Sequence, residues 1–262
     1  MIRAALAITL LVAGLGTARA DFSRAALDAI AAAPKPNAQL PLDSRFIDAQ
    51  GAPRTLGAAL DGKPAVLVFA DYTCRTLCGP ILAFAAGGLE KSGLTPGRDY
   101  HLIVVGIDPK DSLATAIAFK DSHVGNDTPL AKATIMLSGK AEAVRATTAA
   151  AGYRYAYDAG HDQYAHPAAA YVVSAKGRIA RVLSGVGLDG GDLRLALVDA
   201  GNGKIGGLAD QIHLLCYGFD PARGIYTASI TRLLNIGGVL TVIALAAVIG
   251  GMVILKRRGR VA

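Results

Sequence analysis

Two unbroken apolar segments dominate the middle of the chain, at residues 65–70 and 102–107. Apolar runs of this length between turn residues are typical of strands that are buried on both faces of a sheet. Each is followed by a segment that favours a helix, one over 80–91 and one that runs from the predicted N-cap Ser112 to Ser122. This alternation predicts parallel strands that are connected by helices.

The remaining pattern predicts further elements on either side of these units. They are a hairpin over 44–56, a strand over 133–137, a helix over 140–151, a second hairpin formed by 168–174 and 178–183, and a closing helix over 189–199. This order describes an α/β fold, a three-layer sandwich with a mixed sheet. It is the element order of a thioredoxin-like fold, and we assign this domain to residues 39–200.

The two ends of the chain carry apolar segments of a different kind. Residues 1–20 have an early cation, a short apolar core and small residues before Asp21, which is the pattern of a cleaved signal peptide. Residues 236–255 carry no charge and precede a basic tail at 256–262, which predicts one C-terminal transmembrane helix. A retained N-terminal membrane helix and a buried soluble C-terminal helix are the alternatives.

The predicted topology accounts for much of the net charge of +7. Several cations lie in the tail beyond the anchor, and Arg3 and Arg19 leave with the signal peptide. The body therefore keeps no basic stripe that would indicate nucleic acid as a partner. Since a basic tail stays on the cytoplasmic side, we expect a single-pass protein of the cell inner membrane, with its body on the periplasmic side. Residues 21–38 then form an extended leader and residues 201–235 a juxtamembrane stalk.

Cys74 and Cys78 follow the first predicted buried strand, at the point where a helix begins. Redox thioredoxins separate their cysteines by two residues, whereas three intervene here. Thiols at i and i+4 of a helical turn share a face, which suits two thiolates on one soft ion and also allows a disulfide. Arg75 and the helix N-terminus both favour thiolates. Thiols of an exported domain oxidise unless they are reduced or metallated, and two buried structural cysteines are the alternative.

A third ligand is expected from elsewhere in the chain, because two thiolates rarely complete a metal site. Among the histidines, His166 ends the loop that leads into the predicted strand 168–174, and His161 lies in the same loop. In a thioredoxin-like sheet this loop packs beside the helix that carries the cysteines. His166 is therefore the candidate ligand, with an ordinary loop histidine as the alternative. We expect His101 to lie at the surface and His123 to cap the end of its helix.

The third cysteine, Cys216, lies shortly before the predicted anchor. An odd number of cysteines leaves one thiol over from any pairing. Three roles are open for Cys216, namely a structural thiol, a resolving or intermolecular thiol, and an additional metal ligand. His213 stands three residues earlier, a spacing that could bind metal but is a weak signal by itself.

Together, these motifs resemble the Sco/SenC family. The resemblance rests on Tyr72-Thr73-Cys74 with Cys78, on Asp108-Pro109-Lys110-Asp111 after the second strand, and on His166 before the segment 171–178. It spans roughly 39–200 and extends through the segment around Cys216 to the anchor, as in a bacterial branch of the family. Family members are membrane-tethered, copper-binding proteins of the thioredoxin fold that serve cytochrome c oxidase assembly.

The resemblance implies copper, as Cu(I) or Cu(II), with Cys74, Cys78 and His166 as its ligands. Two thiolates and an imidazole are a soft, three-coordinate set, which agrees with copper. Zinc could occupy the same ligands with a water as the fourth.

Three functions are compatible with these residues. The resemblance implies a metallochaperone that delivers copper to, or reduces the cysteines of, the CuA site of cytochrome c oxidase. Its partner would be cytochrome c oxidase subunit II or a similar exported copper protein. The second is a periplasmic thiol–disulfide oxidoreductase, in which Cys74 and Cys78 act on another exported copper or thiol protein. The third is a peroxidase, a reading that Thr73 and Arg75 satisfy only loosely.

Overall fold

The structure is a computed structural model, and the residues that it describes are 30–74, 78–159, 162–184, 188–202, 205–220, 225–228 and 230–258. The predicted signal peptide at 1–20, the first half of the predicted leader (21–29) and His161 lie outside these residues. The side chains of Cys78 and Cys216 also lie outside the description, although both residues belong to described helices.

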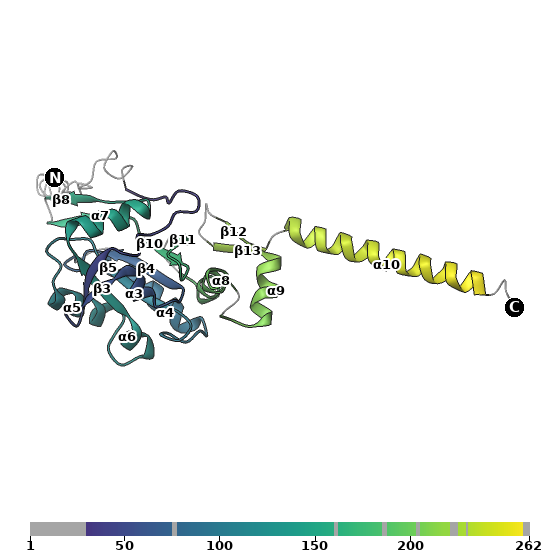
Figure 1. The fold of residues 1–262 in the computed structure, drawn as a ribbon, viewed down its shortest axis with the longest axis horizontal. Helices are drawn as coiled ribbons and strands as arrows, with labels where there is room; N and C mark the ends of the chain where they lie inside the picture. Colours follow the sequence, from purple (N-terminus) through teal and green to yellow (C-terminus); the bar gives the residue numbers. More distant parts are fainter. Residues whose placement is uncertain are drawn as a thin grey trace, which may run out of the picture.

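A seven-stranded mixed sheet forms the centre of the molecule (Figure 1). In spatial order its strands are β11 (Ile179–Ser184), β10 (Ala169–Val173), β4 (Ala65–Ala70), β5 (His101–Gly106), β6 (Ile135–Gly139), β2 (Arg45–Asp48) and β3 (Pro53–Thr55). β4, β5 and β6 are parallel, and β10 runs antiparallel to β4. Every residue of β4 and β5 is buried, as the apolar runs predict. The predicted mixed α/β, thioredoxin-like fold is confirmed.

Helices cover both faces of this sheet and enclose two apolar cores. One face carries α4 (Cys78–Lys91), α5 (Leu113–His123), α6 (Pro129–Ala133) and α8 (Gly190–Ala200), and the other carries α3 (Leu56–Leu60) and α7 (Ala141–Ala150). The first core includes Val66 and Val68, and the second includes Leu67 and Phe69. Because side chains alternate along a strand, β4 contributes to both cores.

Side-chain caps define where several helices begin. Ser112 accepts a hydrogen bond from the Thr115 N–H at 3.2 Å, and the Thr115 hydroxyl accepts one from the Ser112 N–H at 2.8 Å. This reciprocal cap confirms the predicted start of α5. Asp189 caps α8 by accepting from the Gly191 N–H at 2.7 Å, and Thr128 caps α6.

Two small antiparallel pairs lie outside the main sheet. β8 (Ala156–Asp158) and β9 (Gln163–Ala165) form a hairpin just before β10, and β1 (Ala31–Ala32) pairs with β7 (Tyr153–Arg154). The sequence pattern did not predict the β8–β9 hairpin. The β1 pairing means that the end of the predicted leader lies against the body.

The position of His101 corrects one prediction. His101 was expected at the surface, but it is buried as the first residue of β5. β5 lies between β4 and β6, so even its first residue is covered by neighbouring elements. The predicted strand began at residue 102, whereas β5 begins at His101, which pairs with Ala65 of β4.

The chain beyond α8 forms a helix, a hairpin and a long final helix. These are α9 (Leu208–Cys216), β12 (Tyr217–Asp220), β13 (Ile225–Ala228) and α10 (Ile230–Arg258). Arg194 of α8 donates to both carboxylate oxygens of Asp210 at 2.6 and 2.9 Å. The Tyr226 N–H donates to Asp192 of α8 at 3.0 Å. Both α9 and the hairpin are thereby tied to α8.

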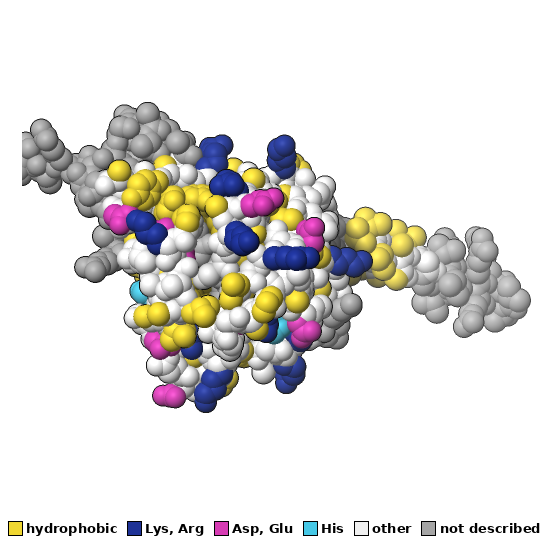
Figure 2. Space-filling model, turned by 60° about the vertical axis from the view of Figure 1, so that its left-hand side comes forward, with side chains coloured by type: hydrophobic (Ala, Val, Ile, Leu, Met, Phe, Trp, Pro, Cys, Tyr) yellow, Lys and Arg dark blue, Asp and Glu magenta, His cyan; other side chains and the backbone are white. Residues whose placement is uncertain are grey.

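α10 leaves the body as one straight helix (Figure 1). It contains the predicted membrane-spanning segment 236–255 and the beginning of the predicted tail 256–262. Figure 2 shows its described part as an apolar projection beside the body, whose visible face mixes cationic, acidic and apolar side chains. Within the described residues, no helix is both long enough and apolar enough to cross a membrane. The C-terminal anchor therefore stays a prediction.

Candidate metal centre

The candidate site lies at the carboxyl edge of the parallel strands, where β4 leads into α4. β4 ends at Ala70, and the chain then turns so that the Cys74 N–H donates to the carbonyl of Asp71 at 3.2 Å. Residues 75–77 lie outside the described part of the chain. Cys78 is the first residue of α4, at the positive end of the helix dipole, where a thiolate is favoured. Both cysteines thus follow the buried strand, as predicted.

Cys74 contacts the strand that leads to His166. Its half-buried Sγ donates to Oε1 of Gln163 at 3.6 Å. Gln163 is the first residue of β9, and His166 directly follows the end of that strand. Cys74 and His166 are close enough for their charges to interact. The fold therefore brings together two of the three predicted ligands, and the side chain of the third, Cys78, lies outside the description.

His166 is held in a form that can bind a metal. Its Nδ1 lies 3.2 Å from the carbonyl oxygen of Pro167. A carbonyl can only accept, so Nδ1 donates this bond and the lone pair of the ring is on Nε2. Burial lowers the pKa of His166, and the Pro167 bond, Cys74 and Asp71 oppose that shift only in part. The neutral imidazole that results is the ligating form.

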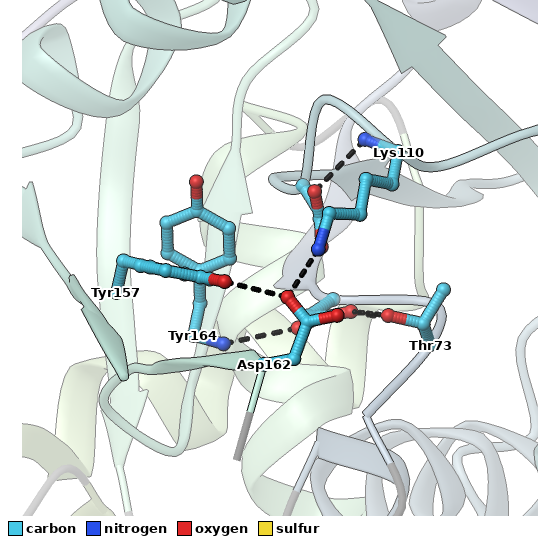
Figure 3. Close-up of polar contacts among 7 residues, drawn as sticks. Thr73, Lys110, Tyr157, Asp162 and Tyr164 are labelled. Carbon is cyan, nitrogen blue, oxygen red and sulfur yellow. Dashed lines mark hydrogen bonds and ion pairs between the residues drawn. The ribbon is translucent and has the colours of Figure 1, made fainter. Parts of the chain in front are cut away.

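Asp71 is a fully buried carboxylate between the cysteine loop and the histidine loop. One of its oxygens accepts from the Thr73 N–H at 2.9 Å and from the Thr73 hydroxyl at 2.8 Å. The other accepts from the Tyr164 N–H of β9 at 3.0 Å. Figure 3 shows these contacts beside Thr73 and Tyr164. Sequence reasoning missed Asp71 and Gln163, and only the place of Asp71 at the carboxyl end of a buried strand could have pointed to it.

A second carboxylate, the half-buried Asp111, lies in the loop after β5. It accepts from the Tyr72 N–H at 3.0 Å and from the Asp108 N–H at 3.1 Å. Burial raises the pKa of Asp111 to about 8, and the nearby carboxylates of Asp71 and Asp108 act in the same direction. The two hydrogen bonds lower this pKa but do not offset the burial. The motif at 108–111 therefore connects the β5–α5 loop to the cysteine loop.

A surface contact closes the same edge. Asp162, in the turn of the β8–β9 hairpin, forms an ion pair with Lys110 and accepts from the Tyr157 hydroxyl at 2.6 Å (Figure 3). Asp162 has a positive φ of 51°, which aspartate tolerates better than most residues. Three segments therefore meet around Cys74 and His166, namely the β4–α4 loop, the β5–α5 loop and the hairpin.

His123 lies close to the start of α4. Its Nδ1 lies 2.8 Å from the Phe119 carbonyl in the last turn of α5, which agrees with the predicted cap. The ring packs on the Phe119 ring at a centroid distance of 4.5 Å. A Cβ added to Gly79 would lie 1.9 Å from its Nε2, so Gly79 leaves the space that this ring fills.

His213 and Cys216 belong to α9, a separate element of the fold. His213 lies in α9, and its ring centroid is 5.9 Å from that of Tyr217. Cys216 ends α9, and its side chain lies outside the description. Among the described residues, no group of three or more His, Cys, Asp or Glu side chains is placed to hold a metal ion. The predicted set of Cys74, Cys78 and His166 includes the Cys78 side chain, which lies outside the description.

Comparison with family models identifies the protein family of the chain that carries this site. The model described as SCO1/SenC matches residues 33–189, more than half of the chain. The chain belongs to the SCO1/SenC family. α9, the β12–β13 hairpin and α10 lie beyond the part that matches the SCO1/SenC model.

Solved structures agree with this SCO1/SenC fold. An Aquifex aeolicus VF5 structure described as an electron transfer protein is 23% identical at a TM-score of 0.57, over 65% of this chain and 96% of its own. A second structure from that organism, described as an electron transport protein, is 24% identical at a TM-score of 0.54. The match covers 64% of this chain and 99% of the other. Arabidopsis thaliana ScoI with copper bound is 18% identical at a TM-score of 0.50. The match covers 60% of this chain and 94% of the other. No protein of curated function matches the chain.

Proposed function

We propose that this SCO1/SenC protein is a membrane-tethered copper-binding protein, which delivers copper to, or reduces the cysteines of, the CuA site of cytochrome c oxidase during assembly. The observation that carries the proposal is the contact of Cys74 with β9, the strand that ends next to His166. A thiol and a neutral imidazole thus come together from distant segments, beside the helix that begins at Cys78. A. thaliana ScoI, which shares the fold, was solved with copper bound, so copper is the first metal to test.

The donor set suits copper better than a hard cation. Two thiolates and one imidazole match Cu(I) and accommodate Cu(II). Cys74, Cys78 and His166 would hold the ion as cargo for transfer. Zinc would need a fourth ligand, such as a water, at the same residues.

The two thiols also permit a redox step without metal. The thiolate of one cysteine attacks a disulfide of the partner's copper site, so that a mixed disulfide forms and one partner sulfur leaves. The second cysteine then displaces the other partner sulfur and forms the disulfide between Cys74 and Cys78. The partner gains two electrons and two protons as two thiols, and this chain loses them.

Either role requires a partner close to the membrane, and the two ends of the chain supply this placement. Residues 1–20 direct export, and residues 236–255 of α10 anchor the body on the periplasmic side of the inner membrane, with the basic tail in the cytoplasm. The uncharged sequence and exposed apolar side chains such as Leu240 and Val242 support this assignment. We expect subunit II of the oxidase or a similar exported copper protein as the partner.

The test is copper binding by the full chain purified in detergent, with a His166→Ala variant. We expect one copper per reduced chain and a sulfur-to-copper charge-transfer band in the Cu(II) form. His166→Ala should lose the stable Cu(II) form because the imidazole is a ligand, yet its thiols should still form a disulfide. His213→Ala is the matched control, since His213 lies apart in α9, and it should keep the parent's stoichiometry and band.

Two results would change the assignment. Parent-like copper binding by His166→Ala would show that His166 is not a ligand. A parent that binds no copper but reduces an oxidised CuA-site peptide would identify the protein as a thiol–disulfide oxidoreductase. A changed band in His213→Ala would bring the α9 segment into the site.

A further inference from the structure

We propose that Asp71 is the positioning residue of this site, whose carboxylate fixes the loop of Cys74 against the strand that delivers His166. The inference deepens the proposed function and rests on it for the copper that the site would hold. Its geometric part, the link between the two loops, stands on contacts among described residues.

The two oxygens of Asp71 serve two different segments. One oxygen takes both bonds from Thr73, the residue before Cys74, at 2.9 and 2.8 Å. The other takes the bond from the Tyr164 N–H at 3.0 Å, two residues before His166. Asp71 has no exposed surface, so water does not substitute for these donors. One rigid carboxylate therefore sets the separation between the cysteine turn and β9.

The hairpin that carries His166 depends on such a link. β9 pairs with β8 in a two-stranded sheet of its own, so no ladder of the seven-stranded sheet holds it. At the surface, the Lys110–Asp162 ion pair ties the turn of the hairpin, but its two side chains are more than half exposed and contribute little. The part-buried bond that the Tyr164 N–H donates to Asp71 acts two residues before His166. It therefore determines where the imidazole lies relative to Cys74.

A second buried aspartate shows what an ordinary turn carboxylate does. Asp48 is also buried and accepts from two backbone N–H groups, those of Gln50 at 3.0 Å and Ala52 at 2.9 Å. Both partners belong to its own hairpin, so Asp48 shapes one local turn. Asp71 differs because its partner Tyr164 lies 93 positions further along the chain. Loss of either carboxylate should reduce stability, but only loss of Asp71 should alter the metal site.

Asp71→Asn separates these roles because it keeps the shape of the side chain. An amide offers one acceptor oxygen and one NH2 donor, so it can satisfy either Thr73 or Tyr164 but turns a donor toward the other. We expect the full-length variant in detergent to bind Cu(II) about 10- to 100-fold more weakly than the parent and to shift the charge-transfer band, as for residues that orient a metal ligand. Asp48→Asn should unfold earlier than the parent and leave both copper readouts unchanged.

Thr73→Val provides a graded variant at the same carboxylate. It removes only the hydroxyl bond and keeps the link to Tyr164, so its Cu(II) affinity should stay closer to that of the parent than to that of Asp71→Asn. An Asp71→Asn protein that folds and keeps the parent's affinity and band would overturn the inference. So would an equal loss of affinity in Asp48→Asn.

A measurement without copper keeps this inference distinct from the proposed function. In the reduced, metal-free parent, the Tyr164 amide should exchange its hydrogen slowly because Asp71 accepts it, and exchange should be faster in Asp71→Asn but not in Asp48→Asn. Rapid exchange of this amide in the parent would refute the link even if Asp71→Asn failed to fold. A parent that binds no copper would remove the proposed function, and the Tyr164 exchange would still decide the role of Asp71.

Discussion

The central strands and the carboxyl edge of the same sheet are built in opposite ways. β4 and β5 are apolar, fully buried and paired without interruption in parallel register. The edge beyond them holds the buried carboxylates Asp71 and Asp108 and the half-buried Asp111 within loops. Apolar burial is non-directional and contributes stability, whereas a buried carboxylate costs free energy unless donors surround it. The core therefore determines whether the chain folds, and the edge determines how the candidate ligands meet.

The largest effect is expected from a substitution in the core, which should leave the edge unchanged. Leu102 of β5 is fully buried, and Leu102→Ala should lower the free energy of unfolding by about 2–5 kcal/mol through lost burial and a cavity. Urea denaturation measures this change, with the half-exposed Ile117→Ala of α5 as a control that should lose less than about 1 kcal/mol. Folded Leu102→Ala should bind copper with the parent's stoichiometry. A changed charge-transfer band would show that core and edge are not separable.

The next effect is expected where helix α4 meets the edge. A methyl group at Gly79 would collide with the His123 ring, so Gly79→Ala should cost about 1–3 kcal/mol through overpacking and displace the start of α4. Gly87 lies in the same helix with no atom within 4 Å of an added Cβ. Gly87→Ala should therefore be stabilising, by up to about 1 kcal/mol. Equal unfolding midpoints for the two variants would contradict the packing assigned to His123.

The smallest effect, taken over a single pH unit, is a dependence on pH that comes from the edge. The pKa of Asp111 is about 8 in the folded chain and about 4 when unfolded, so the folded state binds more protons between these values. The free energy of unfolding should therefore fall as pH rises from about 4 to 8, by at most about 1.4 kcal/mol per pH unit. Asp111→Asn should remove this part of the slope in urea denaturation at pH 5, 6 and 7. Parallel slopes for parent and variant would show that Asp111 is ionised throughout.

The elements that the sequence pattern predicted are those with strong local signals. Continuous apolar runs identified β4 and β5, the cap at Ser112 identified α5, and the glycine turn at Gly177 identified the β10–β11 hairpin. The β8–β9 hairpin was missed because its three-residue strands mix tyrosine with polar residues and show no buried face. α6 and α9 were missed because they are short and fall in segments read as loop and stalk.

The candidate site was predictable only as far as its residue types. The spacing of Cys74 and Cys78 and the loop position of His166 indicated possible ligands, and the structure brings Cys74 and His166 together. The place of Asp71 at the carboxyl end of β4 could have pointed to it, but its role could not be predicted, because that role comes from a bond to Tyr164 that spans 93 positions. Such a pairing depends on the packed arrangement of the loops, which a local pattern does not contain.

The outer strand β3 has a consequence for how a partner can approach. It is only three residues long, it begins with Pro53, which has no N–H to donate, and Arg54 follows. Short, proline-bearing and charged border strands discourage another chain from extending a sheet. Strand addition at β3, and with it the self-association that leads to fibrils, is therefore disfavoured. A partner that reacts with the thiols would instead approach the loops at the carboxyl edge of the sheet.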